Sequence, residues 1–322
     1  REIFINFFIK LAINSCQDKE EKENITRKAL FLLKKWLIIS PGTVIKYQFI
    51  EKTLNNAAGP ANHYRDGPEK KKSCFTVLMI ISTLISFDKE ENISNNMELI
   101  FKILTHPFSN CFTCDNPYII QLISNLTKKL LALNNAQFQA KIIELVESGV
   151  NAYIQAYKSR SANQSYVKNA ITIYTTIRIS KVLLEYKPEE LDKFFESFLE
   201  ISKIFIELFD NRKFYNTPAS RKTGDEDEDL LANIDDHYTE EGFENHKFSF
   251  SNLREFLIIL LRILSQKLTK FTNPDSKEKI YMIELLESIM EKLPDIDLTI
   301  EVLSILNSLL LSDYYMDVKS HI

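Results

Sequence analysis

Glycine is scarce in this chain, with 6 glycines among 322 residues against a usual share of about 7%. Folds that cradle phosphate groups need glycine where the backbone approaches the ligand, and β-rich folds need it in tight turns. The strings GxGxxG and GxxxxGK[ST] are both absent. The sequence therefore excludes Rossmann and P-loop nucleotide sites and disfavours many-stranded β-sandwiches.

The composition is that of a globular protein, with 45% hydrophobic residues, 26% charged residues and a net charge of −4. Its apolar runs fall short of the roughly 20 residues that a membrane span needs; the run Phe256–Leu264, for example, is interrupted by Arg262. Four cysteines are too few for a disulfide scaffold, so we expect reduced thiols. The helical pattern reaches both ends and the first residue is Arg1, which suggests an internal segment of a longer chain.

Apolar residues recur at helical spacing through almost the whole chain, as at Leu122, Leu126 and Leu130. Pro68, Pro117 and Pro188 fit first-turn positions of helices, where a missing N–H is tolerated, and Asn116 would cap the helix that starts at Pro117. The predicted helices are 2–15, 24–40, 43–56, 68–87, 96–106, 117–133, 136–161, 163–185, 188–210, 249–271, 275–292 and 296–312.

These helices form six consecutive pairs, which predicts an all-α fold. Pairs that start near residues 2, 43, 96, 136, 188 and 275 are spaced by about 40–53 residues once the polar insert 211–247 is left out. Helix pairs that repeat every 40–47 residues or so are typical of HEAT and armadillo arrays. We therefore expect an α-solenoid of about six HEAT-like antiparallel helix pairs, with 1–210 and 248–322 as parts of one solenoid.

The insert 211–247 has a composition of its own. Residues 224–244 contain ten acids and no lysine or arginine. A stretch of this kind repels itself and rarely packs, which predicts a projecting loop inside the fifth helix pair. This loop is the strongest candidate for a binding site, for a basic partner surface or a histone-like tail, although a solvated loop without a partner explains it as well. The candidate residues are Asp225, Glu226, Asp227, Glu228, Asp229, Asp235 and Asp236.

No motif predicts catalysis, a metal or a cofactor. Cys111 and Cys114 have CxxC spacing and His106 is near, but a zinc site needs further ligands that the sequence does not show. We interpret both as loop cysteines between helices. The five histidines are scattered and GxSxG is absent, so we predict no catalytic residues, no cofactor and no metal.

Two other features are explained by packing and solvation. The basic run Lys70–Lys72 and the doublets Lys34/Lys35 and Lys128/Lys129 fit solvated helix faces, because a nucleic-acid interface wants a strongly basic face and this chain is net acidic. Trp36 lies on the apolar stripe of the second helix, where core packing is favoured over a role as an interface hot spot.

The order of several amphipathic strings resembles the TRRAP family, the pseudokinase scaffolds of histone acetyltransferase complexes that are related to phosphatidylinositol-3-kinase-like kinases. The resemblance spans nearly the whole chain outside 211–247, and it rests on joint order and spacing because each string alone is a generic helix. The strings are INFFIKLA (5–12), TRKALFLLKKWLIISP (26–41), VIKYQFIEKTL (44–54), CFTCDN (111–116), LTKKLLAL (126–133), AYIQAYKSRSANQSY (152–166), EELDKFFESFLEISKIF (189–205), LREFLIILLRIL (253–264), KIYMIELLESIMEKLPDIDL (279–298) and VLSILNSLL (302–310).

The resemblance implies a non-catalytic nuclear scaffold that contacts transcription activators and other subunits of an acetyltransferase complex. It transfers no site residues, because none of the strings is a chemical motif. Two alternatives share the architecture: a nuclear transport receptor of the importin/exportin type, and the regulatory solenoid of an active kinase of the same superfamily. Binding to the GTPase Ran would favour the first, and intact kinase motifs downstream would favour the second.

We predict that deletion of residues 211–247 leaves the midpoint of thermal unfolding nearly unchanged, because a self-repelling acidic loop contributes little packing. Circular dichroism of the shortened and complete chains would measure the midpoints. A large loss of stability would show that the insert packs against the helices.

Overall fold

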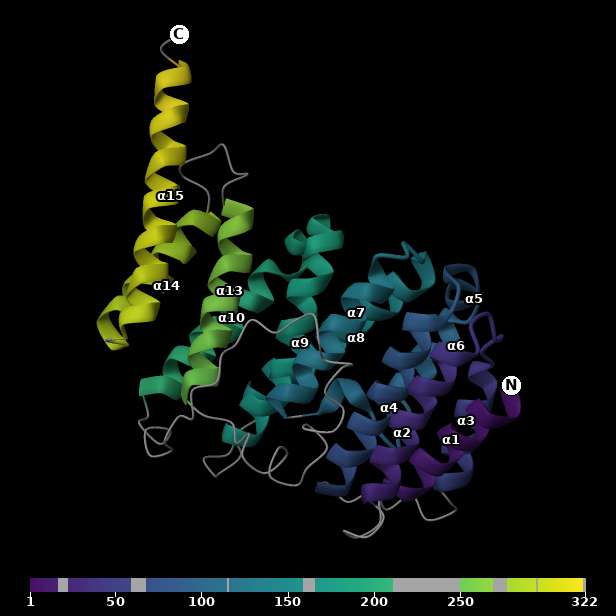
Figure 1. Ribbon diagram of the computed structural model, residues 1–322. Coiled ribbons are helices and arrows are strands. Elements are labelled where there is room, and N and C mark those ends of the chain that lie inside the picture. Colours follow the sequence, from purple (N-terminus) through teal and green to yellow (C-terminus); the bar gives the residue numbers. More distant parts are fainter. Residues whose placement is uncertain are drawn as a thin grey trace. The chain divides into compact units, whose positions relative to one another are not determined.

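The computed structural model is built from α-helices (Figure 1). It describes residues 1–16, 23–58, 68–114, 116–158, 166–210, 250–268, 277–293 and 295–320. Within these ranges there are thirteen α-helices, two short 3-10 helices and no strand, so the predicted all-α fold is confirmed. The helices are α1 (Glu2–Ser15), α2 (Glu23–Ile39), α3 (Tyr47–Ala58), α4 (Pro68–Phe87), α5 (Glu90–Asn95), α6 (Met97–Leu104), η1 (Cys111–Thr113), α7 (Pro117–Leu131), α8 (Ala136–Lys158), α9 (Tyr166–Tyr186), η2 (Pro188–Glu190), α10 (Leu191–Asp210), α13 (Phe250–Leu268), α14 (Lys277–Lys292) and α15 (Ile296–Ser320).

The start of α7 shows how local sequence sets a helix boundary. The side-chain oxygen of Asn116 accepts hydrogen bonds from the backbone N–H groups of Tyr118, at 3.0 Å, and Ile119, at 3.2 Å. Pro117 occupies the first helical position, where no N–H is needed. The predicted cap is therefore confirmed.

The structure differs from the predicted helices at three places for local reasons. Helix α3 begins at Tyr47 and not at residue 43, because Gly42 turns the chain with φ 76° and the Thr43 hydroxyl donates to the Ser40 carbonyl at 2.8 Å. Helix α5 has no counterpart among the predicted helices, since its sequence EENISN has no apolar stripe. Pro188 begins a 3-10 turn that precedes α10.

The chain forms two compact units. Among the described residues, the first unit contains Arg1–Ile142 and the second contains everything from Ile143 onward. The boundary between the two units falls inside α8.

In the first unit the helices pack in two layers. Helices α1, α3 and α6 are successive neighbours in one layer, and α2, α4 and α7 are successive neighbours in the other. Helix α1 packs most extensively on α2, and α4 contacts both α1 and α6 across the layers. Fully buried aromatic side chains, such as Phe75 and Phe108, fill the core of this unit.

The second unit repeats this scheme. Helices α10 and α14 are neighbours in one layer, and α9, α13 and α15 follow one another in the other. The ring of Phe205 on α10 lies 6.0 Å from that of Tyr153 on α8 and 6.4 Å from that of Phe256 on α13. Each helix therefore packs mainly on helices that are close to it in the sequence, as in an α-solenoid.

Helices α8 and α9 of the second unit pack closely at Gly149. A Cβ atom added to Gly149 would lie 2.4 Å from Oγ1 and 3.1 Å from Cγ2 of Thr176. Thr176 is buried, and its β-branched side chain has few alternative rotamers. This contact explains why a residue of poor helix propensity lies in the interior of a 23-residue helix.

We predict that Gly149→Ala lowers the free energy of unfolding by about 1–2 kcal/mol, because the overpacking cost of roughly 1–3 kcal/mol exceeds the gain in helix propensity. Adding Thr176→Ala should recover part of this loss in a double-mutant cycle measured by urea unfolding. Ser148→Ala, at the exposed neighbouring position, is the matched control. Stabilisation by Gly149→Ala would contradict the close contact.

Candidate interaction surfaces

The acidic insert, which was the predicted binding site, lies outside the described residues. Its candidate residues are Asp225, Glu226, Asp227, Glu228, Asp229, Asp235 and Asp236. The histidines at 63, 237, 246 and 321 also lie outside the described residues. A binding role for the insert therefore stays a prediction.

The cysteines of the CxxC string lie in the connection between α6 and α7, as the sequence predicts, and they are buried there. Cys111 lies in η1, and both it and Cys114 are buried. The Cys111 thiol donates to the backbone carbonyl of Cys74 at 3.8 Å, and Cys111 and Cys114 both act on the pKa of the Cys74 thiol. Sequence spacing could not reveal this cluster, because Cys74 is 37 residues away on α4.

This thiol cluster packs as part of the core. Burial, followed by the contacts with Cys111 and Cys114, raises the pKa of the Cys74 thiol well above its ordinary value. The thiolate is the form that binds metals and acts as a nucleophile, so a raised pKa disfavours both kinds of chemistry. Within the described ranges no three His, Cys, Asp or Glu side chains are arranged to hold a metal ion.

His106, the histidine nearest to the CxxC string, is held by hydrogen bonds on both ring nitrogens. Nδ1 accepts from the backbone N–H of Phe108 at 3.1 Å, which leaves Nε2 to donate to Oδ1 of Asn55 at 3.0 Å. Partial burial lowers the pKa of His106, against a smaller opposing effect of Glu51. The ring therefore fixes the end of α6 against α3 in its neutral form.

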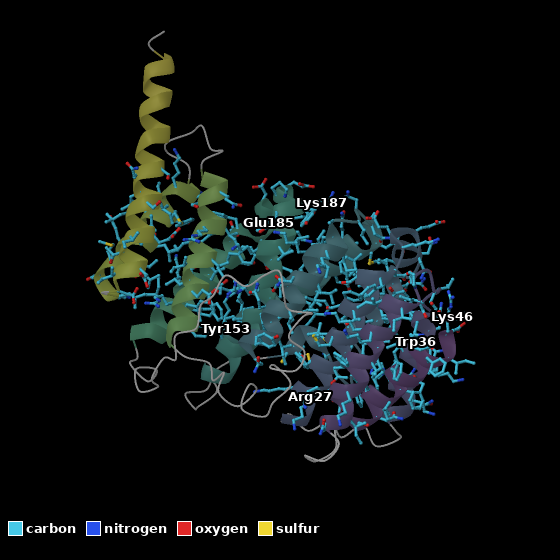
Figure 2. The ribbon with its side chains drawn as sticks, in the orientation of Figure 1. Arg27, Trp36, Lys46, Tyr153, Glu185 and Lys187 are labelled. Atoms are coloured by element: carbon cyan, nitrogen blue, oxygen red, sulfur yellow. The ribbon has the colours of Figure 1, made fainter. Side chains whose placement is uncertain are left out.

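Two side chains differ from the packing predicted for them. Trp36 is only half-buried and lies at the edge of the buried side of α2, which Ala29, Leu33 and Leu37 occupy. Trp36 is labelled in Figure 2. Its ring packs on that of Phe4 from α1, with 4.5 Å between the ring centres. Lys72 is buried, at 8% exposure, and does not lie on a solvated face.

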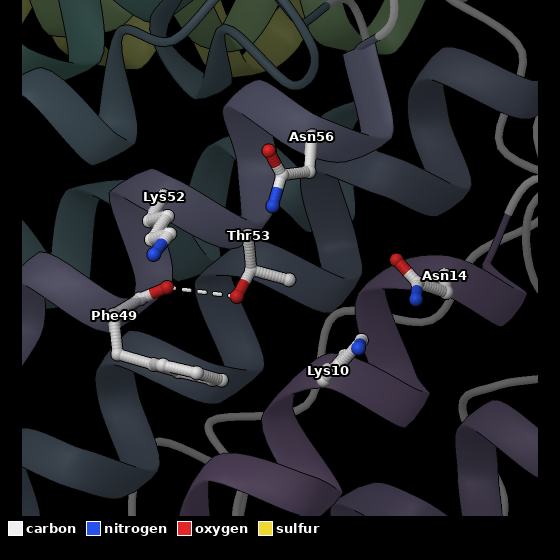
Figure 3. Close-up of a pocket in the computed structure, with 6 residues that line it drawn as sticks. All are labelled: Lys10, Asn14, Phe49, Lys52, Thr53 and Asn56. Carbon is white, nitrogen blue, oxygen red and sulfur yellow. Dashed lines mark hydrogen bonds between the residues drawn. The ribbon is translucent and has the colours of Figure 1, made fainter.

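A hollow of about 360 Å³ lies between α1 and α3 and has a basic lining (Figure 3). Its lining residues are Lys10, Asn14, Phe49, Lys52, Thr53 and Asn56. The Thr53 hydroxyl donates to the Phe49 carbonyl at 2.7 Å, while neither lysine forms an ion pair with a described residue. The hollow carries no nucleophile or acid–base pair for catalysis, but its charge would suit an acidic side chain of a partner.

In the comparison with protein families, the family described as the Tra1 HEAT repeat ring region matches residues 1–317. Comparisons with curated proteins and with solved structures give no match. In the part of the chain that the structure describes, no helix is long and apolar enough to span a membrane.

We predict that the first unit loses stability in alkali, because three of its groups have raised pKa values. Burial raises the pKa of Tyr118 to about 12. Burial, followed by the charge of Asp88 and the hydrogen bond to it, raises the pKa of Tyr47 above its ordinary value. Together with Cys74, these groups hold their protons more tightly in the folded state than in the unfolded state. Their contribution to the free energy of unfolding is therefore complete below about pH 8.5, and it is lost as the pH rises towards their folded-state pKa values.

Urea unfolding at pH 7, 9 and 10.5 should show a fall of about 1–3 kcal/mol over this range. Cys74→Ala should remove the part of the fall that begins near pH 8.5, the ordinary thiol pKa. A free energy of unfolding that stays constant in both proteins would show that these groups are accessible in the folded state.

Proposed function

Since the chain belongs to the Tra1 HEAT repeat ring family, we propose that it is a protein-interaction scaffold in a nuclear histone acetyltransferase coactivator assembly. The observation that carries the proposal is the family match over residues 1–317, which is nearly the whole chain. The earlier resemblance to the TRRAP family supplies the acetyltransferase complex and the activators as partners.

The packing scheme supports a role in binding and positioning proteins. Helices that follow one another in layers present successive ridges on a long surface, and partners can be held along it without any chemical step. Ion pairs stiffen this arrangement. The guanidinium of Arg262 on α13 makes two hydrogen bonds to the Glu301 carboxylate on α15, at 3.0 and 2.8 Å, and Arg254 contacts Asp295 and Asp297 at 3.2 and 2.9 Å.

The described residues also support a proposal in which this chain carries out no chemical step. The thiols are buried, burial raises the pKa of the Cys74 thiol, and His106 uses both ring nitrogens in structural contacts. The residues that line the hollow between α1 and α3 include no histidine or carboxylate. What remains for function is the surface of the helices and, as a proposal, the acidic insert, which would bind a basic segment such as a histone-like tail.

The proposal is tested by purifying the chain, tagged in its full-length natural context, from nuclear extract. We expect acetyltransferase subunits to co-purify and the eluate to acetylate histones with acetyl-coenzyme A. The matched control is the same protein without residues 211–247, which should retain the acetyltransferase and lose only contacts that depend on the insert.

The alternatives give different results in the same material. A nuclear transport receptor would bring down the GTP-bound form of Ran without acetyltransferase activity. A regulatory solenoid of an active kinase would bring down kinase activity that an ATP-site inhibitor abolishes. Either result would overturn the proposed function.

A further inference from the structure

Each of two neighbouring helices places a lysine and an asparagine on the hollow between α1 and α3. They are Lys10 and Asn14 on α1, and Lys52 and Asn56 on α3. In each pair the two residues are four positions apart, so they lie on the same side of their helix. Figure 3 shows one pair on each side of the hollow. Four side chains with N–H donors therefore line this space.

The hollow carries positive charge without an opposing charge. No aspartate or glutamate lines it, and neither Lys10 nor Lys52 forms an ion pair with a described residue. The same two helices are joined by an ion pair nearer their starts, where the Lys46 ammonium lies 2.9 Å from a carboxylate oxygen of Glu2. The acid that completes the contact at that point has no counterpart beside Lys10 and Lys52.

The next contact in the same layer, between α3 and α6, is completed by the chain's own side chains. Gln48 donates to the carboxamide oxygen of Asn96 at 3.3 Å, and the His106 ring pairs with Asn55 at 3.0 Å. Glu51 faces this side of α3, where its charge acts on the pKa of His106. Polar partners therefore bridge α3 and α6, whereas the hollow between α1 and α3 has donors without acceptors from across the gap.

Charge and donor number favour a phosphate monoester over a carboxylate as the missing group. A carboxylate has one negative charge and would leave one of the two ammonium groups uncompensated. A phosphorylated serine or threonine carries a charge of about −1.5 to −2 at pH 7 and has three acceptor oxygens. The flexible stems of Lys10 and Lys52 let both ammonium groups turn to one phosphate. The carboxamides of Asn14 and Asn56 can donate to its remaining acceptor sites.

A phosphate that is attached to a peptide suits the hollow better than a free polyphosphate. Two ammonium groups balance one phosphate group, and the volume of about 360 Å³ is small for a ligand pocket. Lys10, Asn14, Lys52 and Asn56 are all exposed, and exposed ion pairs contribute little on their own. The ligand therefore needs further contacts, which the residues beside a phosphorylated side chain would make with the half-buried Phe49 ring and the helix surfaces.

We propose that the hollow between α1 and α3 binds a phosphorylated serine or threonine side chain of a partner protein. Lys10 and Lys52 would hold the phosphate, and Asn14 and Asn56 would donate to its oxygens. The inference rests on the proposed scaffold function and adds a condition to it: the partner that uses this site is recruited only after its phosphorylation.

The site is tested with the full-length protein and peptide libraries on beads. The libraries have random sequences around a central phosphoserine or phosphothreonine, and matched libraries carry serine, threonine or glutamate at the centre. We expect the phosphorylated libraries to retain about five times more protein than the others, because only phosphate balances both lysines. Equal retention on the glutamate library would assign the hollow to carboxylates, and absence of retention on the phosphorylated libraries would also overturn the proposal.

Variants show whether retention depends on the hollow. Lys10→Gln and Lys52→Gln should each weaken the affinity for the best-retained phosphopeptide about fivefold, and the double variant roughly twentyfold, as measured by fluorescence anisotropy. Lys52→Arg keeps the charge and should bind almost as the unaltered protein does. The matched control is Lys28→Gln, which removes an exposed lysine of α2 outside the hollow. All these positions are exposed, so the midpoint of thermal unfolding should stay nearly unchanged.

Unchanged affinity in the double variant would place the phosphopeptide elsewhere and overturn the proposal. Inositol hexakisphosphate serves as the probe for a free polyphosphate, and its binding through Lys10 and Lys52 without any retention on the phosphorylated libraries would assign the hollow to small molecules. Failure of this inference is distinguishable from failure of the proposed function. A protein that binds no phosphopeptide but co-purifies with acetyltransferase subunits would overturn only the inference.

Discussion

The fold depends on one constraint: a pair of amphipathic helices has more apolar surface than its two members can cover for each other. Helix α1 illustrates this, because it buries Ile5, Ile9 and Ile13 only by combining contacts with α2, α3 and α4. Each further pair covers part of the surface of the one before it and exposes part of its own. The resulting stability is shared along the chain and is not concentrated in a single central core.

The helices could be predicted from the sequence because their signals are local. The apolar spacing predicts the observed bounds of α1 and α4. Asn116 and Pro117 define the start of α7, because the Asn116 side chain accepts from backbone N–H groups two and three residues ahead. Short elements escaped prediction, because the six residues of α5 are too few to display a helical period.

Contacts between distant parts of the sequence could not be predicted in the same way. Cys74 joins Cys111 and Cys114 because α4 packs on η1, and no spacing rule connects positions 37 residues apart. Trp36 was expected in the core and is half-buried against Phe4, because periodicity shows that a helix has an apolar stripe but not how completely a neighbour covers its edge. On α2 both sides are apolar, so only the packing distinguishes the buried side from the exposed one. The acidic insert lies outside the described residues, so its binding role stays a prediction.

The sequential packing of the helices also affects how the chain folds and how its sequence can evolve. Because helices contact mainly those near them in the sequence, contact order is low and native contacts can form early from several starting points. A substitution at one helix pair is then felt mainly by the adjacent pairs. Lengthening a connection between two helices costs little more than loop entropy. An array of this kind can acquire new segments between its helices while the packing elsewhere is preserved.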